Sequence, residues 1–292
     1  MDFLVTAVVH LFVFIIAITP FFVLYLISNI LGFILYRIVG YRKEVVYDNL
    51  RNSFPGQSEN ELKRIARLSY RNLSDVMVET LKGFSLTRKQ VVQRHRFMNP
   101  ELLDPFLKRG QSFIVTASHY NNWEWGGLSI PLQIDCDVAV FYKPLSNKRM
   151  DRVIKKNRER TGIEMVSFYR TAATFKKYED RQTAYFLVAD QSPSNARKSY
   201  WVDFLGRETA FLHGPELYAK SYNMPVLYAD MKRVKRGYYE IYLSVLVEEP
   251  KGLEDGEITR RFAKKLEDVV RKQPENWLWS HKRWKMKKPE KA

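Results

Sequence analysis

The chain has 292 residues, enough for one sizeable α/β domain with a small appendage and too few for several large domains. A hydrophobic content of 46% is typical of a packed protein and excludes a disordered chain. The 48 basic and 32 acidic side chains leave a net charge of +16, which predicts a partner with negative charge: a nucleic acid, an anionic membrane surface or a phosphorylated substrate.

The N-terminus is the first predicted element, and it is apolar. No Asp, Glu, Lys or Arg occurs in residues 3–36. A helix of about 20 predominantly apolar residues is long enough to cross the hydrocarbon core of a bilayer. Pro20 is expected to break this stretch and to leave a longer second arm at 21–39. No basic residue precedes the apolar run, which is also longer than that of a signal peptide. We therefore expect residues 1–40 to form a transmembrane or membrane-anchoring segment and residues 41–292 a catalytic domain.

The charges that follow this segment indicate its orientation. Arg37, Arg42 and Lys43 come directly after the apolar residues, and the positive-inside tendency then places the body of the protein on the cytoplasmic side. Two alternatives stay open. One is a re-entrant hairpin that never crosses the bilayer, and the other is a hydrophobic helix pair buried in a soluble core.

Residues 58–82 predict a long amphipathic helix that covers a core face. Ser58 and Glu61 have the spacing of a capping box at its start. Apolar or small residues then recur at steps of three and four, which is the helical period. They are Leu62, Ile65, Ala66, Ser69, Leu73, Val76, Met77 and Leu81.

Beyond this helix, strand-like and helix-like segments alternate along the chain. Short runs rich in β-branched or aromatic residues predict strands at 112–117, 137–141, 184–189, 226–231 and 238–247. Helices are predicted at 148–160, 172–179, 215–222 and 258–272. This alternation predicts an α/β fold with an open mixed sheet flanked by helices, and no internal repeat or second domain is evident.

The most informative segment is TASHYNNWEWGG, residues 116–127. The apolar strand SFIVTAS, residues 112–118, ends within this segment, and polar and aromatic residues follow it. Ligands of open α/β sheets usually bind beyond the carboxyl ends of strands. His119 precedes Glu124 by five residues, so on one straight helix the two side chains would lie about 140° apart. They can meet only where a loop leads into a helix that starts near Asn122.

A histidine in contact with an acid suits proton transfer from a hydroxyl group. A neutral hydroxyl is a weak nucleophile and needs a base with a pKa near the working pH, which imidazole supplies. A carboxylate bonded to the other ring nitrogen fixes the tautomer and stabilises the imidazolium that forms. Taken alone, His119 is better explained as a structural histidine, so the catalytic hypothesis depends on the rest of the chain.

Six motifs in order resemble one family over nearly the whole chain. They are YRKEVVYDNLRNSFP (41–55), HYNNWEW (119–125), NRERTG (157–162), ADQSP (189–193), VDFLGRETAFLHGP (202–215) and PENWLWSHKRWK (274–285). His-x4-Glu at a strand end, behind an N-terminal membrane segment, resembles the glycerolipid acyltransferase superfamily. The full set is most similar to the late acyltransferases of lipid A biosynthesis, the lauroyl and myristoyl transferases.

Two features depart from the pattern of that family. Asn121 and Asn122 stand where a Gly-Asn pair is more usual, and the Asp-Gln segment continues as SPSNARKSYW. These departures leave the exact acceptor open.

The resemblance implies an enzyme that transfers a fatty acyl group to a hydroxyl of a 3-hydroxyacyl chain on a lipid A precursor. The implied donor is a fatty acyl thioester on acyl carrier protein, and no metal or organic cofactor is implied because the thioester is already activated. His119 would deprotonate the acceptor hydroxyl, and Glu124 would orient His119. The implied location is the bacterial inner membrane, with the catalytic domain on the cytoplasmic side.

Further residues carry over from the family with binding roles. Arg158 stands at the family's characteristic arginine and is a candidate for stabilising the tetrahedral oxyanion or for contacting a phosphate, with a structural ion pair as the alternative. The remaining candidates for shaping or binding the substrates are Asp190, Gln191 and Asn122.

Two other histidines and the basic C-terminus are candidates for contacts around the cleft. His213 could line it, although a structural role is favoured. His281 lies among Trp, Lys and Arg residues that suit a membrane interface, and the alternative is a solvated basic tail whose aromatic rings pack inward. Lys155, Lys156 and Arg160 are the expected docking face for the acidic acyl carrier protein.

Other classes of protein lack their signatures in this sequence. Cys136 is the single cysteine, which excludes an internal disulfide framework and a cysteine metal cluster. There is no Gly-x-Ser-x-Gly elbow, no phosphate-binding Gly-x4-Gly-Lys loop, no zinc spacing and no recognised nucleic-acid-binding module. Two functions remain as alternatives: acyl transfer to another lipid, such as an amino-acid-linked hydroxy lipid or a lysophospholipid, and a catalytically inactive membrane-docking protein.

Overall fold

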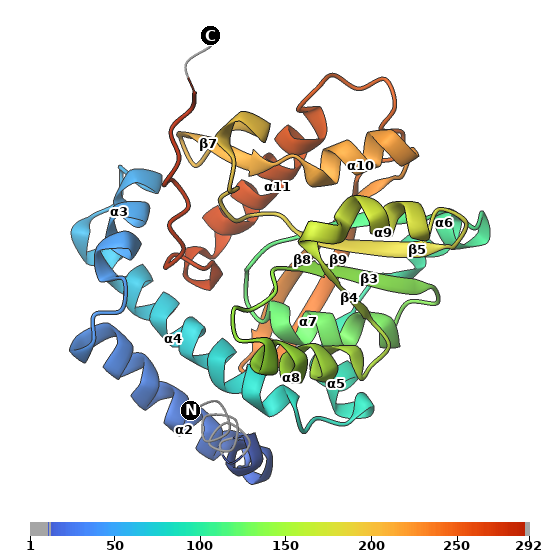
Figure 1. The fold of residues 1–292 in the computed structure, drawn as a ribbon. Coiled ribbons are helices and arrows are strands. Elements are labelled where there is room, and N and C mark those ends of the chain that lie inside the picture. The colour runs from blue at the N-terminus through green and yellow to red at the C-terminus, as the bar shows by residue number, and fades with distance from the viewer. Residues whose placement is uncertain (1–10, 12, 290–292) are drawn as a thin grey trace.

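A seven-stranded mixed sheet forms the centre of the computed structural model, which describes residues 11 and 13–289 (Figure 1). Its strands are β1 (His95–Phe97), β2 (Phe113–Ala117), β3 (Asp137–Tyr142), β4 (Glu164–Ser167), β5 (Thr183–Val188), β8 (Val226–Lys235) and β9 (Tyr238–Val247). Their order is β1-β9-β8-β2-β5-β3-β4. Neighbouring strands are parallel except β8 and β9, which form an antiparallel pair. The predicted open mixed sheet is confirmed.

Helices cover both faces of the sheet. They are α3 (Lys43–Ser53), α4 (Glu59–Gly83), α5 (Arg88–Arg94), α6 (Asp104–Lys108), α7 (Trp123–Ser129), α8 (Lys148–Glu159), α9 (Thr171–Lys177), α10 (Gly214–Tyr222) and α11 (Glu257–Lys272). Short helical turns lie at η2 (Pro100–Leu103), η3 (Ile130–Leu132), η4 (Phe168–Arg170), η5 (Ala196–Lys198) and η6 (Pro274–Asn276). Along β2, Phe113 and Val115 face a core shared with α6 and η3, whereas Ile114 faces a core shared with α9 and α10. Because both faces are buried, the strand is apolar except for Thr116, whose hydroxyl donates to the Leu227 carbonyl at 2.8 Å.

All five predicted strands and all four predicted helices after the long helix are present, and β8 continues to Lys235 beyond its predicted end at 231. The sequence did not predict β1 and β4, which have three and four residues and are too short for a clear alternating pattern. It also missed the hairpin of β6 (Ser199–Phe204) and β7 (Arg207–Leu212). Leu205 and Gly206 join these strands with φ angles of 55° and 73°, the conformation of a turn in which Asn-Gly is the usual signal.

The long helix α4 begins as its sequence predicts. The Ser58 side chain accepts a hydrogen bond from the backbone N–H of Glu61 at 3.2 Å, which satisfies one of the free N–H groups of the first turn. The helix then continues for 25 residues and contacts α2 (Phe21–Phe33), α3 and α7. This helix therefore connects the N-terminal segment to the centre of the fold.

The N-terminal apolar segment divides at Pro20, as expected. Helical residues precede Pro20, and α2 follows it and continues into the π-helix η1 (Ile34–Ile38). Phe21–Ile38 is long and apolar enough to cross a membrane, with a mean hydropathy of 1.9. Most of the first arm, residues 1–10 and 12, lies outside the described residues.

One face of α2 packs against the protein, and the other is apolar and exposed. Leu24, Ser28 and Gly32 are buried where α2 runs along α4 (Figure 1). The outward stripe is large and apolar and consists of Phe22, Leu26, Ile30 and Phe33, which are 57–71% exposed. Only 22% of the apolar segment is buried, so the alternative of a helix enclosed in a soluble core is contradicted.

Candidate active site

The candidate site lies where β2 and β5 end side by side. These two strands are parallel, with Ala117 opposite Val188, so the residues that follow them meet at one edge of the sheet. The imidazole Nδ1 of His119 lies 2.7 Å from a carboxylate oxygen of Asp190, and the backbone N–H of His119 donates to the other oxygen at 2.9 Å. The register of β2 against β5 therefore brings Asp190 to His119, although the two residues are far apart in the sequence.

Asp190 is buried and fully hydrogen-bonded. Its side chain is 2% exposed and also accepts a 2.8 Å hydrogen bond from the indole N–H of Trp277. Burial by itself raises the pKa of Asp190, but the charge of His119 and the hydrogen bonds from His119 and Trp277 outweigh it, so the pKa lies below its ordinary value. An ionised Asp190 can only accept, which assigns the proton between the two groups to Nδ1, so that in the neutral imidazole the lone pair is on Nε2.

The Nε2 side of His119 faces a cleft. Nε2 lies 3.1 Å from the amide nitrogen of Gln191, and the ring of Trp123 meets the imidazole edge-on at 5.1 Å between centroids. The His119 side chain is 18% exposed, in contrast to the closed environment of Asp190. The basic nitrogen is thus the part of this pair that a ligand can reach.

Glu124 does not orient His119, which corrects the expectation from the sequence. Among the described residues, its carboxylate is bonded to the Arg158 guanidinium, with Nε at 3.1 Å and Nη2 at 2.7 Å. Glu124 lies in the first turn of α7 and Arg158 in the last turn of α8, so this pair joins two helices across the cleft. The expected alternative of a structural ion pair describes the observed bonding of Arg158.

Asn122 and Asn121 are structural and do not line the cleft, which corrects the assignment of Asn122 to substrate binding. Asn122 is fully buried, accepts a hydrogen bond from the Trp125 N–H as the N-cap of α7 and donates to Glu79 at 2.7 Å. Asn121 has a φ of 54° and donates to the Met231 carbonyl. Asparagine tolerates this left-handed conformation, which explains how it can replace the more usual glycine.

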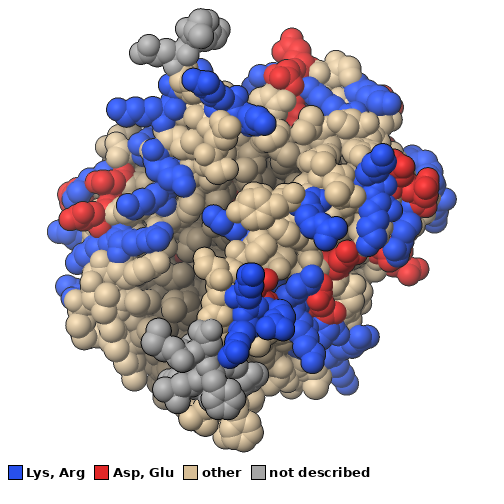
Figure 2. All heavy atoms as spheres, viewed as in Figure 1, with Lys and Arg blue, Asp and Glu red and all other residues tan. Residues whose placement is uncertain are grey.

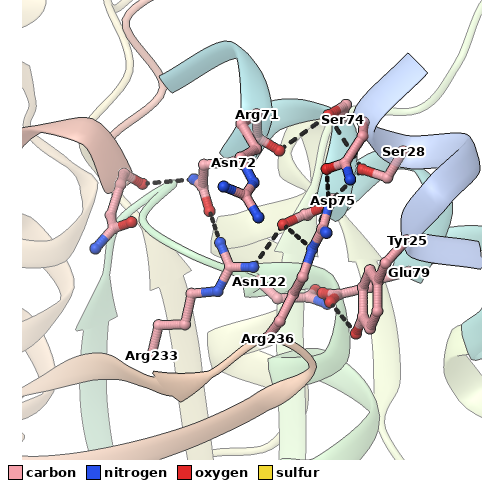
Figure 3. A network of polar contacts seen from close by, with 12 residues as sticks. Tyr25, Ser28, Arg71, Asn72, Ser74, Asp75, Glu79, Asn122, Arg233 and Arg236 are labelled. Carbon is pink, nitrogen blue, oxygen red and sulfur yellow. Dashed lines mark hydrogen bonds and ion pairs between the residues drawn. The ribbon is translucent and has the colours of Figure 1, made fainter. Parts of the chain in front are cut away.

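A buried polar network beneath this loop connects it to the N-terminal helix (Figure 3). Glu79 of α4 accepts hydrogen bonds from Asn122, from Tyr25 of α2 at 2.8 Å and from Tyr239 of β9 at 2.7 Å. Burial raises the pKa of Glu79, and the hydrogen bonds from Tyr239 and Tyr25 oppose that rise.

One helical turn earlier, Asp75 is a second buried carboxylate of the same network. It accepts from Ser28 of α2 at 2.5 Å and pairs with Arg233 and Arg236 of the β8–β9 hairpin. Glu79 of α4 therefore holds the loop that carries His119, and side chains from α2 and the hairpin in turn hold Glu79 and Asp75 (Figure 3).

The cleft beside His119 has a volume of about 740 Å³, within the range of about 300–1,000 Å³ that is usual for small-molecule sites. Its polar lining includes His119, Glu124, Arg158, Gln191, His213 and His281. The rest is mainly apolar and includes Phe97, Ile130, Val140, Ile163, Met165, Phe186, Leu187 and Ile241. A polar wall that contains His119 thus adjoins an apolar cavity that suits a hydrocarbon chain.

The C-terminal segment closes one side of the cleft and packs its tryptophans inward. Trp277 is 4% exposed and Trp279 is 1% exposed, which contradicts their placement at a membrane interface and agrees with the alternative of inward-packed rings. His281 accepts a 3.0 Å hydrogen bond from the Ser192 N–H, and burial lowers its pKa to about 4. His281 is therefore neutral at pH 7 and braces the segment that carries Gln191.

Metal ligands do not gather in the part of the chain that the structure describes, since no group of three His, Cys, Asp or Glu side chains converges there.

The fold and the site together define an α/β enzyme whose histidine–carboxylate pair opens into an apolar cleft. The chain belongs to the bacterial lipid A biosynthesis acyltransferases, since the model of that family matches residues 2–286. It is 21% identical over 270 residues to the lipid A biosynthesis lauroyltransferase of Escherichia coli (strain K12), covering 91% of this chain and 86% of the relative. The chain is thus an acyltransferase, and the resemblance found in its six motifs is confirmed.

Proposed function

We propose that this acyltransferase moves a fatty acyl group from acyl carrier protein to a hydroxyl of a 3-hydroxyacyl chain on a lipid A precursor. The observation that supports this most directly is the His119–Asp190 pair at the mouth of an apolar cleft. The family and the lauroyltransferase relative support a lipid acceptor. The donor thioester is already activated, so the reaction needs no further cofactor.

His119 is the general base in this proposal. Its Nε2 takes the proton of the acceptor hydroxyl in the place where the amide of Gln191 now lies, and Asp190 stabilises the imidazolium that forms. The hydroxyl oxygen attacks the thioester carbon and gives a tetrahedral oxyanion. Collapse of this intermediate breaks the carbon–sulfur bond, and the imidazolium returns its proton to the leaving thiolate.

Glu124 and Arg158 position and stabilise charge in this proposal and do not act as the base. Arg158 directs Nε and Nη2 to Glu124, which fixes the plane of the guanidinium in the wall of the cleft. Because the guanidinium is planar, this also fixes the direction of Nη1. Nη1 is our candidate hydrogen-bond donor to the developing oxyanion or to a phosphate of the acyl donor. The apolar part of the cleft receives the acyl chain.

The acyl carrier protein is proposed to dock on α8. Lys155 pairs with Glu159 at 3.5 Å, and Lys156 is exposed. Arg160 is less available for docking, because its guanidinium donates to the Gly83 carbonyl at 2.7 Å and to the Asn157 side chain at 3.0 Å. Charge reversal at Lys156 and Arg152 should raise the KM for the donor and leave kcat unchanged, and an unchanged KM would exclude α8 as the docking face.

The N-terminal segment is proposed to anchor the enzyme in the bacterial inner membrane with the catalytic domain on the cytoplasmic side. The exposed apolar stripe of α2 and the basic residues after Ile38 support this orientation. Protease digestion of sealed inner-membrane vesicles of known sidedness tests it. Cleavage of the catalytic domain only when the cytoplasmic face is accessible is expected.

The test of the function is His119→Ala in a deletion strain and in purified enzyme. We expect loss of one acyl chain from lipid A in the deletion strain, no rescue by the variant, and a fall in kcat/KM of at least about 10³-fold with an unchanged melting temperature. Mass spectrometry of the lipids also separates the alternatives. An unchanged lipid A with a changed amino-acid lipid or phospholipid would overturn this acceptor, and full rescue by the variant would indicate a docking protein.

A further inference from the structure

A large basic concavity lies at the end of the N-terminal apolar helix, separate from the reactive cleft. It has a volume of about 1160 Å³ and is bordered by η1, α3 and the start of α4. Eight Lys and Arg residues line it, against only Glu44 and Asp48 of opposite charge. Figure 2 shows such blue side chains gathered on the side of the molecule where α3 lies in Figure 1. The concavity is therefore strongly positive.

Most of this charge is not neutralised within the protein. Arg51 and Arg64 pair with Glu59 and Glu61 at 2.8 and 2.7 Å. The other six cations of the lining have no salt-bridge partner among residues 11 and 13–289, although Arg42 donates a hydrogen bond to the Ser280 carbonyl at 3.1 Å. They are Arg37, Arg42, Lys43, Lys63, Arg67 and Lys282. Cations that converge on one concave surface and far outnumber its carboxylates favour an anionic ligand.

The border of the concavity indicates where that ligand comes from. Ile38 and Val39 are 70% and 63% exposed and adjoin Arg37, at the end of the segment that can cross a membrane. The charged ends of Arg37 and Lys43 lie over the Tyr36 ring at 5.3 and 4.9 Å. Tyrosine and basic residues at the end of an apolar helix are typical of the headgroup level of a bilayer.

We propose that this concavity binds the phosphorylated headgroup of an anionic phospholipid. The apolar residues beside it would contact the acyl chains of the same lipid. A nucleic acid or a free phosphate has no hydrocarbon chain that could contact these residues. Lys282 lines the concavity, and its neighbour His281 lines the reactive cleft, so the two cavities share the wall formed by the C-terminal segment. A headgroup bound here holds the mouth of the cleft beside the bilayer surface.

The experiment measures lipid binding to the full chain in micelles of a neutral detergent, without turnover. Phosphatidylglycerol is the probe, phosphatidylcholine is the zwitterionic comparison, and inorganic phosphate is the free-anion competitor. The test variant combines Arg37→Gln, Lys63→Gln and Arg67→Gln, all at exposed positions without ion pairs in the described structure. The matched control combines Lys108→Gln, Lys198→Gln and Lys251→Gln, exposed residues that line neither cavity.

We expect the protein to bind phosphatidylglycerol at least about 10-fold more tightly than phosphatidylcholine at low salt. The test variant should lose at least about 10-fold in affinity and the control less than about threefold, with equal melting temperatures. A second variant, Lys43→Gln with Lys282→Gln, removes two other cations of the lining and should also weaken binding. Equal affinity of the test variant and the control, no preference between the two lipids, or displacement of the lipid by millimolar phosphate would each overturn the proposal.

Discussion

Two of the regions in which the described structure buries carboxylates, around Asp190 and around Asp75 and Glu79, differ in what surrounds the partner of the acid. Asp190 is closed off on every side except toward His119, whose Nε2 remains open to the cleft. Asp75 and Glu79 are fully buried and have all their partners inside the protein. A ligand in the cleft can reach Nε2 of His119, the partner of Asp190. No ligand in the cleft reaches the bonds that Asp75 and Glu79 make inside the protein. The partner's access to the cleft, and not burial, therefore distinguishes Asp190 from Asp75 and Glu79.

The largest change in stability is expected at Asp75. Asp75→Asn leaves Arg233 and Arg236 without their buried counter-ion, which should lower the free energy of unfolding by about 3–5 kcal/mol. Chemical denaturation in detergent measures this value. Glu240→Gln, which breaks the more exposed pair with Arg96, is the control and should cost less than about 1 kcal/mol. Equal losses in the two variants would show that the network is not the structural centre described above.

A smaller loss is expected where the two regions meet at Asn122. Asn122→Ala removes the cap of α7 and one hydrogen bond to Glu79, which should cost about 1–3 kcal/mol. Asn147→Ala removes an exposed cap of α8 with no buried partner and should cost about 1 kcal/mol or less. The difference between the two melting curves isolates the bond to Glu79, and no difference would mean that this bond contributes nothing.

The smallest effect is a pH dependence from His281. Its pKa of about 4 in the folded protein lies below the value of about 6.5 in the unfolded chain, so the unfolded chain binds more protons between these values. Stability should therefore fall as the pH drops from 6.5 to 4, by about 1–2 kcal/mol after allowance for partial exposure. His281→Gln should flatten the dependence of the melting temperature on pH in this window. A variant with the same slope as the wild type would assign the dependence to other groups.

Much of this architecture could be predicted from the sequence, because local patterns encode it. The helical period of α4 and its Ser58 cap, the apolar strands β2 and β5, and the break at Pro20 are all local signals. His119 and Asp190 were both candidates for the same reason, since each follows an apolar strand. Elements that depend on a short strand or an unusual turn, such as β1 and the Leu205–Gly206 hairpin, carried no such signal.

Contacts between distant segments could not be predicted in this way. His119 and Asp190 are 71 positions apart, and only the register of β2 against β5 brings them together. The nearer acid, Glu124, pairs with Arg158 because α7 turns its first residues toward α8. The burial of Trp277 likewise involves distant segments, since its ring packs against Phe204 and its indole N–H donates to Asp190, which no property of the C-terminal segment alone indicates.

The most direct test of the account compares Asp190→Asn with Glu124→Gln in one assay of acyl transfer by purified enzyme. If Asp190 holds His119 in its reactive tautomer, Asp190→Asn should lower kcat by about 10³–10⁴-fold, because an amide can reverse the ring orientation or donate in the wrong direction. Glu124→Gln should lower it by about 10–100-fold, since it only loosens Arg158. The reverse order, with near-normal turnover in Asp190→Asn and a collapse in Glu124→Gln, would contradict the central claim.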